Sequence, residues 1–196
     1  MNPTMKKTLV AESRRWTLIF CLLFSASAGA QSYITGAATQ LFTTFRYFDA
    51  QGVQDKNYKG VYTGAYDFGM RHIGEKGFMY RGAIGMHGGG ATLVYDAMNY
   101  SWQLRYASAH AGIGWMFGHG ATRFYLTADP YYARLVKATQ ILNNQDLDAI
   151  QAKSIRDDDY GVWFLPGLQF TASEKVSIYV EASYRMGLCN IENDQG

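Results

Sequence analysis

Hydrophobic and polar residues alternate along most of this chain with a period of two. In the stretch 61–72 the large apolar side chains occupy even positions, namely Tyr62, Tyr66, Phe68 and Met70. The polar side chains occupy odd positions, namely Thr63, Asp67 and Arg71. Successive residues of a strand point to opposite faces, so the pattern predicts a strand with one apolar face and one polar face.

Seven segments show this alternation, at 41–49, 61–72, 78–87, 102–117, 123–136, 160–170 and 176–188. In the fourth segment the phase changes, because Trp102 and Tyr106 share one parity whereas Ile113 and Phe117 share the other. A β-bulge within 108–112 would account for this change, and so would two shorter strands. With 21 glycines and 15 tyrosines in 196 residues, composition also favours β structure.

The predicted connections alternate between short and long. Short links lie at 74–77, 118–121 and 173–175, and long links at 50–59, 88–100 and 138–159. This spacing predicts an antiparallel up-and-down meander with tight turns at one end and long loops at the other. Outer-membrane β-barrels have that asymmetry. A soluble lipocalin-like calyx is the competing architecture, since it is also a closed meander.

Charged residues recur on the parity opposite the large apolar side chains: Arg46, Asp67, Arg71, Arg81, Arg105, Arg123, Asp129, Glu181 and Arg185. In a membrane barrel this parity would face the lumen, whereas a soluble barrel would turn it to solvent. Residues four apart on one strand are separated by roughly 13 Å. We therefore expect charges such as Asp67 and Arg71 to pair across strands and to form a structural network.

The first thirty residues have the layout of a secretory signal peptide. Four basic residues precede the short apolar run 16–24, and Ala28-Gly29-Ala30 forms a small-residue cleavage site. We expect residues 1–30 to be removed and the remainder to reach the outer membrane. This export, together with the asymmetry of the links, favours the membrane barrel over the calyx.

Cleavage changes the charge and the cysteine content. The mature chain 31–196 would keep 14 basic and 15 acidic residues, so no basic surplus points to nucleic acid. Cys189 would be its lone cysteine, which excludes an internal disulfide and disfavours a cysteine-based metal site.

Three runs in the second half of the mature chain combine alternation with specific residues: Arg123-Phe-Tyr-Leu-Thr-Ala-Asp-Pro-Tyr-Tyr-Ala-Arg-Leu-Val-Lys137, Asp159-Tyr-Gly-Val-Trp-Phe-Leu-Pro-Gly-Leu-Gln-Phe170 and Tyr184-Arg-Met-Gly-Leu-Cys-Asn-Ile191. With these runs this half of the chain resembles PorT-like outer-membrane β-barrel proteins. The resemblance implies an eight-stranded barrel from a Bacteroidota-type Gram-negative bacterium. Only 191–196 follow the seventh segment, too few for a membrane strand of about 9 to 11 residues. We therefore expect domain 31–196 to lack its final strand and to show an open seam between its first and seventh strands.

Catalytic and metal-binding patterns are weak. His87-Gly-Gly-Gly90 resembles a lipase oxyanion-hole motif, but the chain has no Gly-x-Ser-x-Gly elbow, and a flexible loop is expected. Ser108 and His110 share a strand face and could belong to the triad of a lipid A acyl hydrolase. Asp157-Asp-Asp159 could attract a cation, although a solvated loop is expected. The histidines at 72, 87, 110 and 119 lack metal-ligand spacing.

The sequence predicts a non-catalytic outer-membrane barrel without cofactor or metal. Its lumen would be filled by side chains, because eight strands enclose about that much space. Its partners would be outer-membrane lipid and an extracellular ligand or envelope protein, bound through long loops such as 138–159. A lipid-modifying enzyme is the first alternative, and a narrow channel or secretion-associated barrel is the second.

Overall fold

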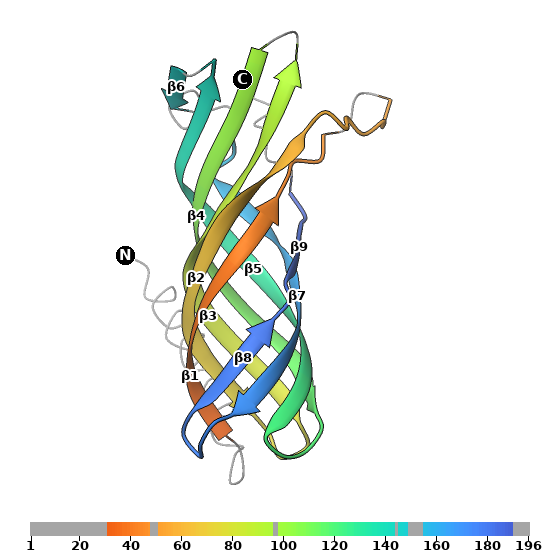
Figure 1. Ribbon diagram of the computed structural model, residues 1–196, viewed down its shortest axis with the longest axis vertical. Helices are drawn as coiled ribbons and strands as arrows, with labels where there is room; N and C mark the ends of the chain where they lie inside the picture. Colours follow the sequence, from red (N-terminus) through yellow and green to blue (C-terminus); the bar gives the residue numbers. More distant parts are fainter. Residues whose placement is uncertain (1–30, 48–50, 96–97, 144, 149–154, 190–196) are drawn as a thin grey trace, which may run out of the picture.

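The computed structural model describes residues 31–47, 51–95, 98–143, 145–148 and 155–189, which form a single antiparallel sheet (Figure 1). The predicted signal peptide and the residues after Cys189 lie outside this part. The strands are β1 (Gln31–Thr43), β2 (Lys59–Ile73), β3 (Phe78–Tyr95), β4 (Met98–Phe117), β5 (Thr122–Leu142), β6 (Gln145–Asp148), β7 (Asp158–Thr171), β8 (Ser177–Glu181) and β9 (Tyr184–Gly187).

The sheet follows the order β1-β2-β3-β4-β5-β7-β8 and curls strongly, so that seven strands form a half-barrel (Figure 1). Strand β6 folds back onto β5, and β9 continues β8 along β7. The all-β fold and the antiparallel meander predicted from the sequence are confirmed. No helix in the described residues is long and apolar enough to cross a membrane.

The two edges of the sheet are β1 and the β8–β9 pair. Within the described residues they share no backbone pairing, which confirms the predicted seam. Six antiparallel pairings separate them, so both edges run in the same direction. A side chain bridges the seam, because Tyr179 Oη donates a hydrogen bond to the Gly36 carbonyl oxygen at 3.0 Å.

The seventh strand is split into β8 and β9 by a proline on its neighbour. Ala182 N donates to Pro166 O at 2.9 Å, but proline has no N–H to complete the pair. The register is the same on both sides of this point, since Gly167 pairs with Glu181 and Gly161 with Gly187. The predicted segment 176–188 is thus one strand with a local interruption in its ladder.

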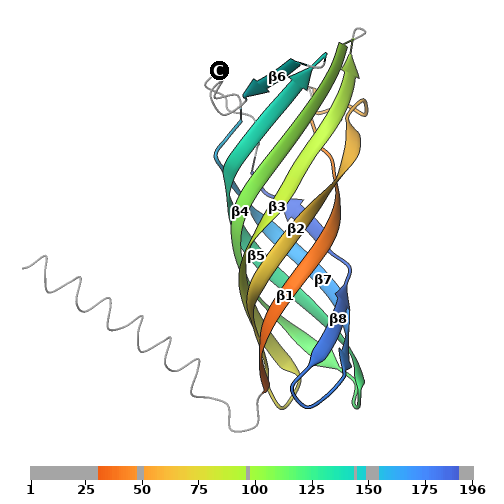
Figure 2. The ribbon, with the colours of Figure 1, turned by 60° about the vertical axis from the view of Figure 1, so that its left-hand side comes forward.

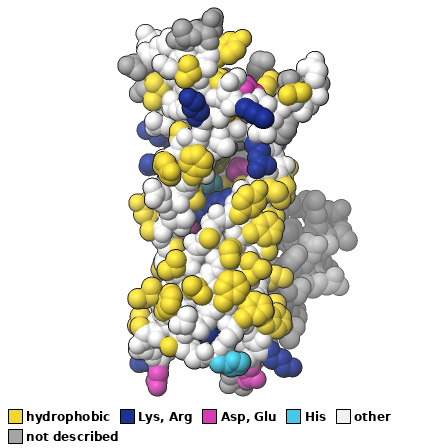
Figure 3. All heavy atoms as spheres, turned by 45° about the vertical axis from the view of Figure 1, so that its right-hand side comes forward, with side chains coloured by type: hydrophobic (Ala, Val, Ile, Leu, Met, Phe, Trp, Pro, Cys, Tyr) yellow, Lys and Arg dark blue, Asp and Glu magenta, His cyan; other side chains and the backbone are white. Residues whose placement is uncertain are grey.

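The exposed face of the sheet is mostly apolar, whereas the enclosed face carries most of the buried charged side chains. Tyr62 is 75% exposed and Phe68 is 64% exposed, whereas Arg71 is 3% exposed. The stretch 61–72 is therefore oriented as its alternation predicts. Figure 3 shows hydrophobic side chains over the lower two-thirds of the wall and basic side chains gathered above them. The same view shows charged and histidine side chains of the interior through a hollow in the wall.

Two apolar clusters pack inside the curled sheet. The larger joins β4, β5 and β7, and contains Leu104, Tyr106, Tyr131, Leu135, Ile155, Trp163 and Leu165 among others. The smaller lies near the tight turns and contains Ile73, Met79, Met116 and Tyr125. At the end opposite these turns, β3, β4 and β5 extend beyond β1, β2, β7, β8 and β9, and β6 lies beside the tip of β5 (Figure 2).

The first strand differs from the prediction. It spans 31–43 rather than 41–49, and Leu41 faces inward with 6% exposure. Arg46 is exposed and lies outside any strand. This segment alternates only weakly, because it contains small residues such as Gly36, Ala37 and Ala38. It is a strand because all thirteen of its residues pair with β2.

The fourth strand is also simpler than predicted. It runs without a break from Met98 to Phe117, and its even-numbered residues point inward from Tyr100 to Met116. The apparent phase change arises because the interior is aromatic at this level, where Leu104 and Tyr106 are buried. Neither the bulge at 108–112 nor two shorter strands is present. The irregularity lies in β5, where Val136 is the extra residue between the pairs Arg105–Lys137 and Tyr106–Leu135.

Two of the predicted long links are mostly strand. Residues 88–95 continue β3 and pair with 98–105 of β4, so most of the predicted loop at 88–100 is strand, and residues 96–97 lie outside the described part of the chain. The link 138–159 contains the end of β5 and the β6 hairpin. Glycine-rich sequence suggested a loop at 88–90, but cross-strand pairing holds these residues extended.

Candidate functional site

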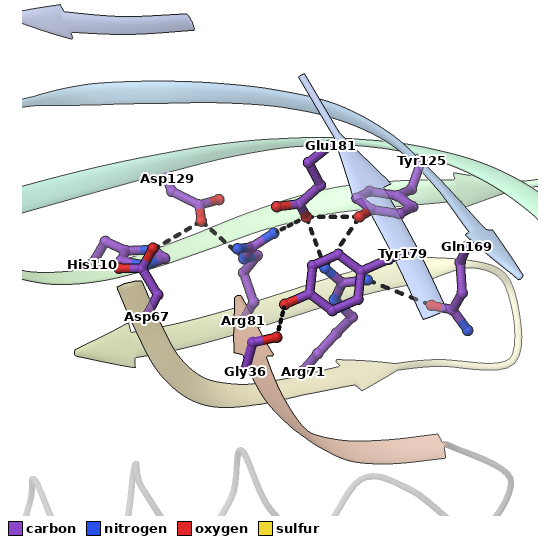
Figure 4. A network of polar contacts seen from close by, with 10 residues as sticks. All are labelled: Gly36, Asp67, Arg71, Arg81, His110, Tyr125, Asp129, Gln169, Tyr179 and Glu181. Carbon is purple, nitrogen blue, oxygen red and sulfur yellow. Dashed lines mark hydrogen bonds and ion pairs between the residues drawn. The ribbon is translucent and has the colours of Figure 1, made fainter. Parts of the chain in front are cut away.

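A cluster of polar side chains occupies the interior of the curled sheet (Figure 4). Its members come from inward positions of β2, β3, β4, β5, β7 and β8, and we call it the interior polar cluster: Asp67, Arg71, Arg81, His110, Tyr125, Asp129, Gln169, Tyr179 and Glu181. The alternation of each strand places them inside, because successive residues of a strand point to opposite faces of the sheet.

Glu181 is the shared acceptor of the cluster. Its Oε1 accepts hydrogen bonds from Arg71 Nη2 at 2.8 Å, Arg81 Nη1 at 2.5 Å and Tyr125 Oη at 2.7 Å. In the ion pairs Arg71–Glu181 and Arg81–Glu181, every side chain is at most 12% exposed. One carboxylate on β8 thus holds two arginines of β2 and β3 from across the interior.

Arg71 has aromatic as well as ionic partners. Its Cζ lies 4.5 Å from the ring centroid of Tyr125 and 4.6 Å from that of Tyr179. Its guanidinium also donates to Gln169 Oε1 at 3.5 Å. Cation–π contacts gain strength when they are removed from water, so these rings stabilise a charge that is buried.

Asp129 forms the second centre of the cluster and is 0% exposed. Its Oδ2 lies 3.1 Å from Arg81 Nε and 3.0 Å from His110 Nδ1. A Cβ on Gly112 would collide with the Asp129 carboxylate, and one on Gly85 would collide with the Asp67 carboxylate. Glycine at these two positions therefore makes room for the acids.

The carboxylates of Asp67, Asp129 and Glu181 share the interior with three arginines, Arg71, Arg81 and Arg185. The Cζ of Arg185 lies 3.8 Å from the ring centroid of Trp163. A fourth arginine, Arg123, points inward nearer the tight turns. Because an uncompensated buried charge is expensive, the acids and arginines that pair in the interior stabilise one another.

Several polar atoms near His110 make no hydrogen bond within the described residues. They include donors and acceptors: Asp67 Oδ1, Asp129 Oδ1, His110 Nε2, Trp163 Nε1 and Arg185 Nη1. His110 Nε2 and Asp67 Oδ1 are 3.8 Å apart, which is an ion-pair distance but too long for a hydrogen bond. A polar group reaching this part of the interior would find partners of both kinds.

The candidate Ser108–His110 pair is not formed. His110 contacts Asp129, whereas Ser108 Oγ lies 3.3 Å from Nδ1 of His87. The His87 ring stacks on Tyr106 with centroids 5.3 Å apart and meets Trp163 edge-on. Ser108 and His87 are both buried on the inner face of the sheet. The pair is enclosed by aromatic rings rather than directed to the outer wall.

Seven of the nine predicted lumen charges lie on the inner face. Asp67, Arg71, Arg81, Asp129, Glu181 and Arg185 come together as described, whereas Arg123 points inward near the tight turns and its Nε has no hydrogen bond within the described residues. Arg46 and Arg105 are exposed and do not belong to the network. The prediction places Arg105 inward because its neighbours Leu104 and Tyr106 are large and apolar, but these two residues point inward and Arg105 points outward.

The contribution of His110 and Gln169 to this network is absent from the sequence prediction. The sequence suggests His110 as a partner of Ser108 and gives it no metal-ligand spacing, although it shares its inward parity with Gly112 and Tyr106. Gln169 lies between two exposed apolar residues of β7, Leu168 and Phe170. Their parity was available from the sequence, but no sequence signal specified which inward residues meet across the interior.

The remaining candidate motifs do not assemble into sites. Gly88–Gly90 are paired in β3 and form no oxyanion loop. Asp158 accepts from Tyr132 Oη, while Asp159 accepts from Tyr131 Oη at 2.9 Å and from Cys189 Sγ at 3.1 Å. Burial raises the pKa of the Cys189 thiol.

His72 contacts Ser32 and Tyr80, and His119 is exposed in a tight turn. The described residues contain no cluster of three or more metal-ligating side chains.

Comparison of the chain with protein-family models, with curated proteins and with solved structures finds no match.

Proposed function

We propose that this chain is a non-catalytic outer-membrane β-barrel protein with an interior filled by side chains. The observation that carries the proposal is the inverted distribution of polarity. Large apolar residues such as Tyr62 and Phe68 are exposed, whereas Asp129 and Arg71 are buried. Lipid favours this arrangement, because it solvates apolar side chains and does not solvate charges.

The height of the apolar wall supports the same proposal. On β4 the outward residues from Ala107 to Phe117 are uncharged, and Arg105 follows directly above them. Eleven residues of strand, tilted by about 40°, span roughly 25 Å, which is the height of the apolar band of outer-membrane barrels. Exposed aromatic residues lie at both borders, Phe117 and Phe124 below and Tyr132 and Tyr160 above.

The interior supports a structural role in preference to conduction. The interior polar cluster joins strands that are distant in the sheet, and the larger apolar cluster packs between it and the far ends of β4 and β5. An ion would have to separate several buried pairs to pass. We therefore propose that the barrel does not conduct, and that its extended strands and loops contact an extracellular ligand or an envelope protein. The PorT-like resemblance remains part of this proposal.

The enzymatic alternative lacks an equivalent observation. A lipid-modifying enzyme must present its nucleophile to the acyl chains that surround the wall. Ser108, the candidate nucleophile, is buried inside the sheet and contacts His87. The proposal therefore assigns Ser108 a structural position.

Cell fractionation tests this proposal. The full-length protein should be recovered in the outer-membrane fraction, resist extraction at alkaline pH, and migrate differently in gels before and after heating. Recovery in the soluble fraction would contradict the proposal, because the exposed apolar wall would then need another cover.

A further inference from the structure

Three basic side chains stand together on the outer face of β4 and β5. Arg105, Arg134 and Lys137 are all exposed. Arg105 lies directly opposite Lys137, and Ala107, two residues further along β4, lies opposite Arg134. Residues that are opposite or diagonal on one face of a sheet lie about 4.5–8 Å apart, so the three charges form a compact basic patch.

The bulge at Val136 creates this patch. In a regular strand Arg134 and Lys137 would point to opposite faces, because they are three residues apart. The extra residue in β5 resets the alternation, so that both are exposed while Leu135 and Ala138 are buried. The irregular backbone thus brings a second cation of β5 to the same face as Arg105.

Few acids neutralise the patch. Within the described residues, Arg105 and Lys137 form no ion pair with a carboxylate closer than 4.0 Å. The residue opposite Arg105 on β3 is Gly88, which has no side chain. Asp158 is opposite Arg134 and offsets part of its charge, while also accepting a hydrogen bond from Tyr132, so the unpaired charge of the patch lies mainly on Arg105 and Lys137. Like charges directly opposite each other are unfavourable, so an anion held between Arg105 and Lys137 would stabilise this arrangement.

The patch lies at the border of the apolar wall. Tyr132 is the next exposed residue below Arg134, and Ala107 is the next below Arg105. If the wall is embedded in lipid, as the proposed function holds, this border is the level of the headgroups. Phosphate is the anion that headgroups present there, and arginine binds it through two parallel hydrogen bonds.

We propose that Arg105, Lys137 and Arg134 bind the phosphate of a lipid headgroup in the leaflet at the end of the barrel opposite the tight turns. This inference rests on the proposed function. The lipid lies along the outer wall, with its phosphate between Arg105 and Lys137 and its acyl chains over the apolar residues below.

Lipid titration of the purified full-length protein tests the inference. In a neutral detergent, dioleoyl phosphatidic acid and dioleoyl phosphatidylcholine are added separately, and retained lipid is counted by native mass spectrometry. The wild type should retain phosphatidic acid in preference to phosphatidylcholine. The double variant Arg105→Gln/Lys137→Gln should bind phosphatidic acid about tenfold more weakly, because each basic residue near a lipid surface contributes to binding.

A matched control variant loses the same two positive charges at the opposite end of the sheet, in the tight turns. Lys76 and Lys175 are exposed residues of the tight turns, and Lys76→Gln/Lys175→Gln should retain the wild-type preference. Equal loss in both double variants would overturn the site, since the effect would then follow net charge. The site would also be overturned if the wild type did not prefer phosphatidic acid to phosphatidylcholine, or if Arg105→Gln/Lys137→Gln bound phosphatidic acid as tightly as the wild type. Either result would leave the proposed function intact. Recovery of the wild type in the soluble fraction of cells would overturn both.

Discussion

Glu181 Oε1 and Arg71 Nη2 lie 2.8 Å apart, although the two residues belong to β8 and β2, which are not neighbours in the sheet. The ion pair crosses the interior and connects the last strands of the sheet to the first ones. Arg81 of β3 contacts the same carboxylate oxygen. The curl of the sheet is therefore held by side chains inside it as well as by the backbone ladders.

Removal of the Glu181 carboxylate should destabilise the fold. In Glu181→Ala two buried arginines lose their shared acceptor, and breaking a buried pair from one side costs about 3–5 kcal/mol. The free energy of unfolding, measured by urea titration in lipid vesicles, should fall by that amount. Glu174→Ala in an exposed turn is the control and should change it by no more than about 0.5 kcal/mol. An equally small loss in Glu181→Ala would show that the network contributes little.

The substitution Gly112→Ala should also disturb the interior. The added Cβ would collide with the Asp129 carboxylate and displace it from Arg81 and His110. Overpacking of this kind costs about 1–3 kcal/mol, so the temperature at which the folded gel band disappears should drop. Gly36→Ala is a matched control, because nothing lies within 4 Å of its added Cβ. The steric explanation fails if both variants lose the same stability.

Loss of the Tyr179 hydroxyl tests the bridge across the seam. Tyr179→Phe keeps the ring against Arg71 but removes the hydrogen bond to the Gly36 carbonyl. A hydrogen bond contributes about 0.5–1.5 kcal/mol, so amide exchange in β1 should become faster. Tyr33→Phe removes a hydroxyl that donates to Gln31 on the same strand, and it should leave this exchange unchanged. Unchanged exchange in Tyr179→Phe would contradict a role for the bridge.

Substitution of Ser108 tests the absence of catalysis. If the protein has a structural role, cells producing Ser108→Ala and cells producing the wild type should have the same acylation of their outer-membrane lipid, measured by mass spectrometry of extracted lipid. Deacylation that depends on the wild-type protein and disappears in Ser108→Ala would establish the enzymatic alternative instead.

Alternation predicted the two faces of a strand well where large apolar side chains occupy one parity and polar side chains occupy the other. The two faces of segment 61–72 and the shared face of Asp129, Glu181 and Arg185 follow from period two, whereas the inward direction of that face follows from the choice of a membrane barrel over a calyx. The prediction failed where this contrast is weak, as in the Gly- and Ala-rich β1, and where the interior itself is aromatic, as beside Leu104 and Tyr106. Glycines at 88–90 suggested a loop because local sequence does not report the pairing with β4.

The partners within the interior polar cluster could not be predicted. Parity places a residue on a face, but register and curl decide that Glu181 reaches Arg71 and that His110 reaches Asp129 instead of Ser108. The bulge at Val136 was likewise unpredictable, because an extra residue in one strand is defined by its neighbour. These are properties of the assembled sheet, which a single segment does not encode.

The orientation of the wall can be measured with two tryptophans. Trp115 is 44% exposed on the outer face and Trp163 is 1% exposed inside. Two variants of the full-length protein, each with the other three tryptophans replaced by phenylalanine, retain one of these residues. Both are inserted into vesicles whose lipids carry brominated acyl chains, which quench the fluorescence of rings that they touch.

We predict strong quenching of Trp115 and little quenching of Trp163, compared with vesicles of the same lipid without bromine. Strong quenching of Trp163 together with unquenched Trp115 would contradict the account, because the buried polar face would then be the face in contact with lipid.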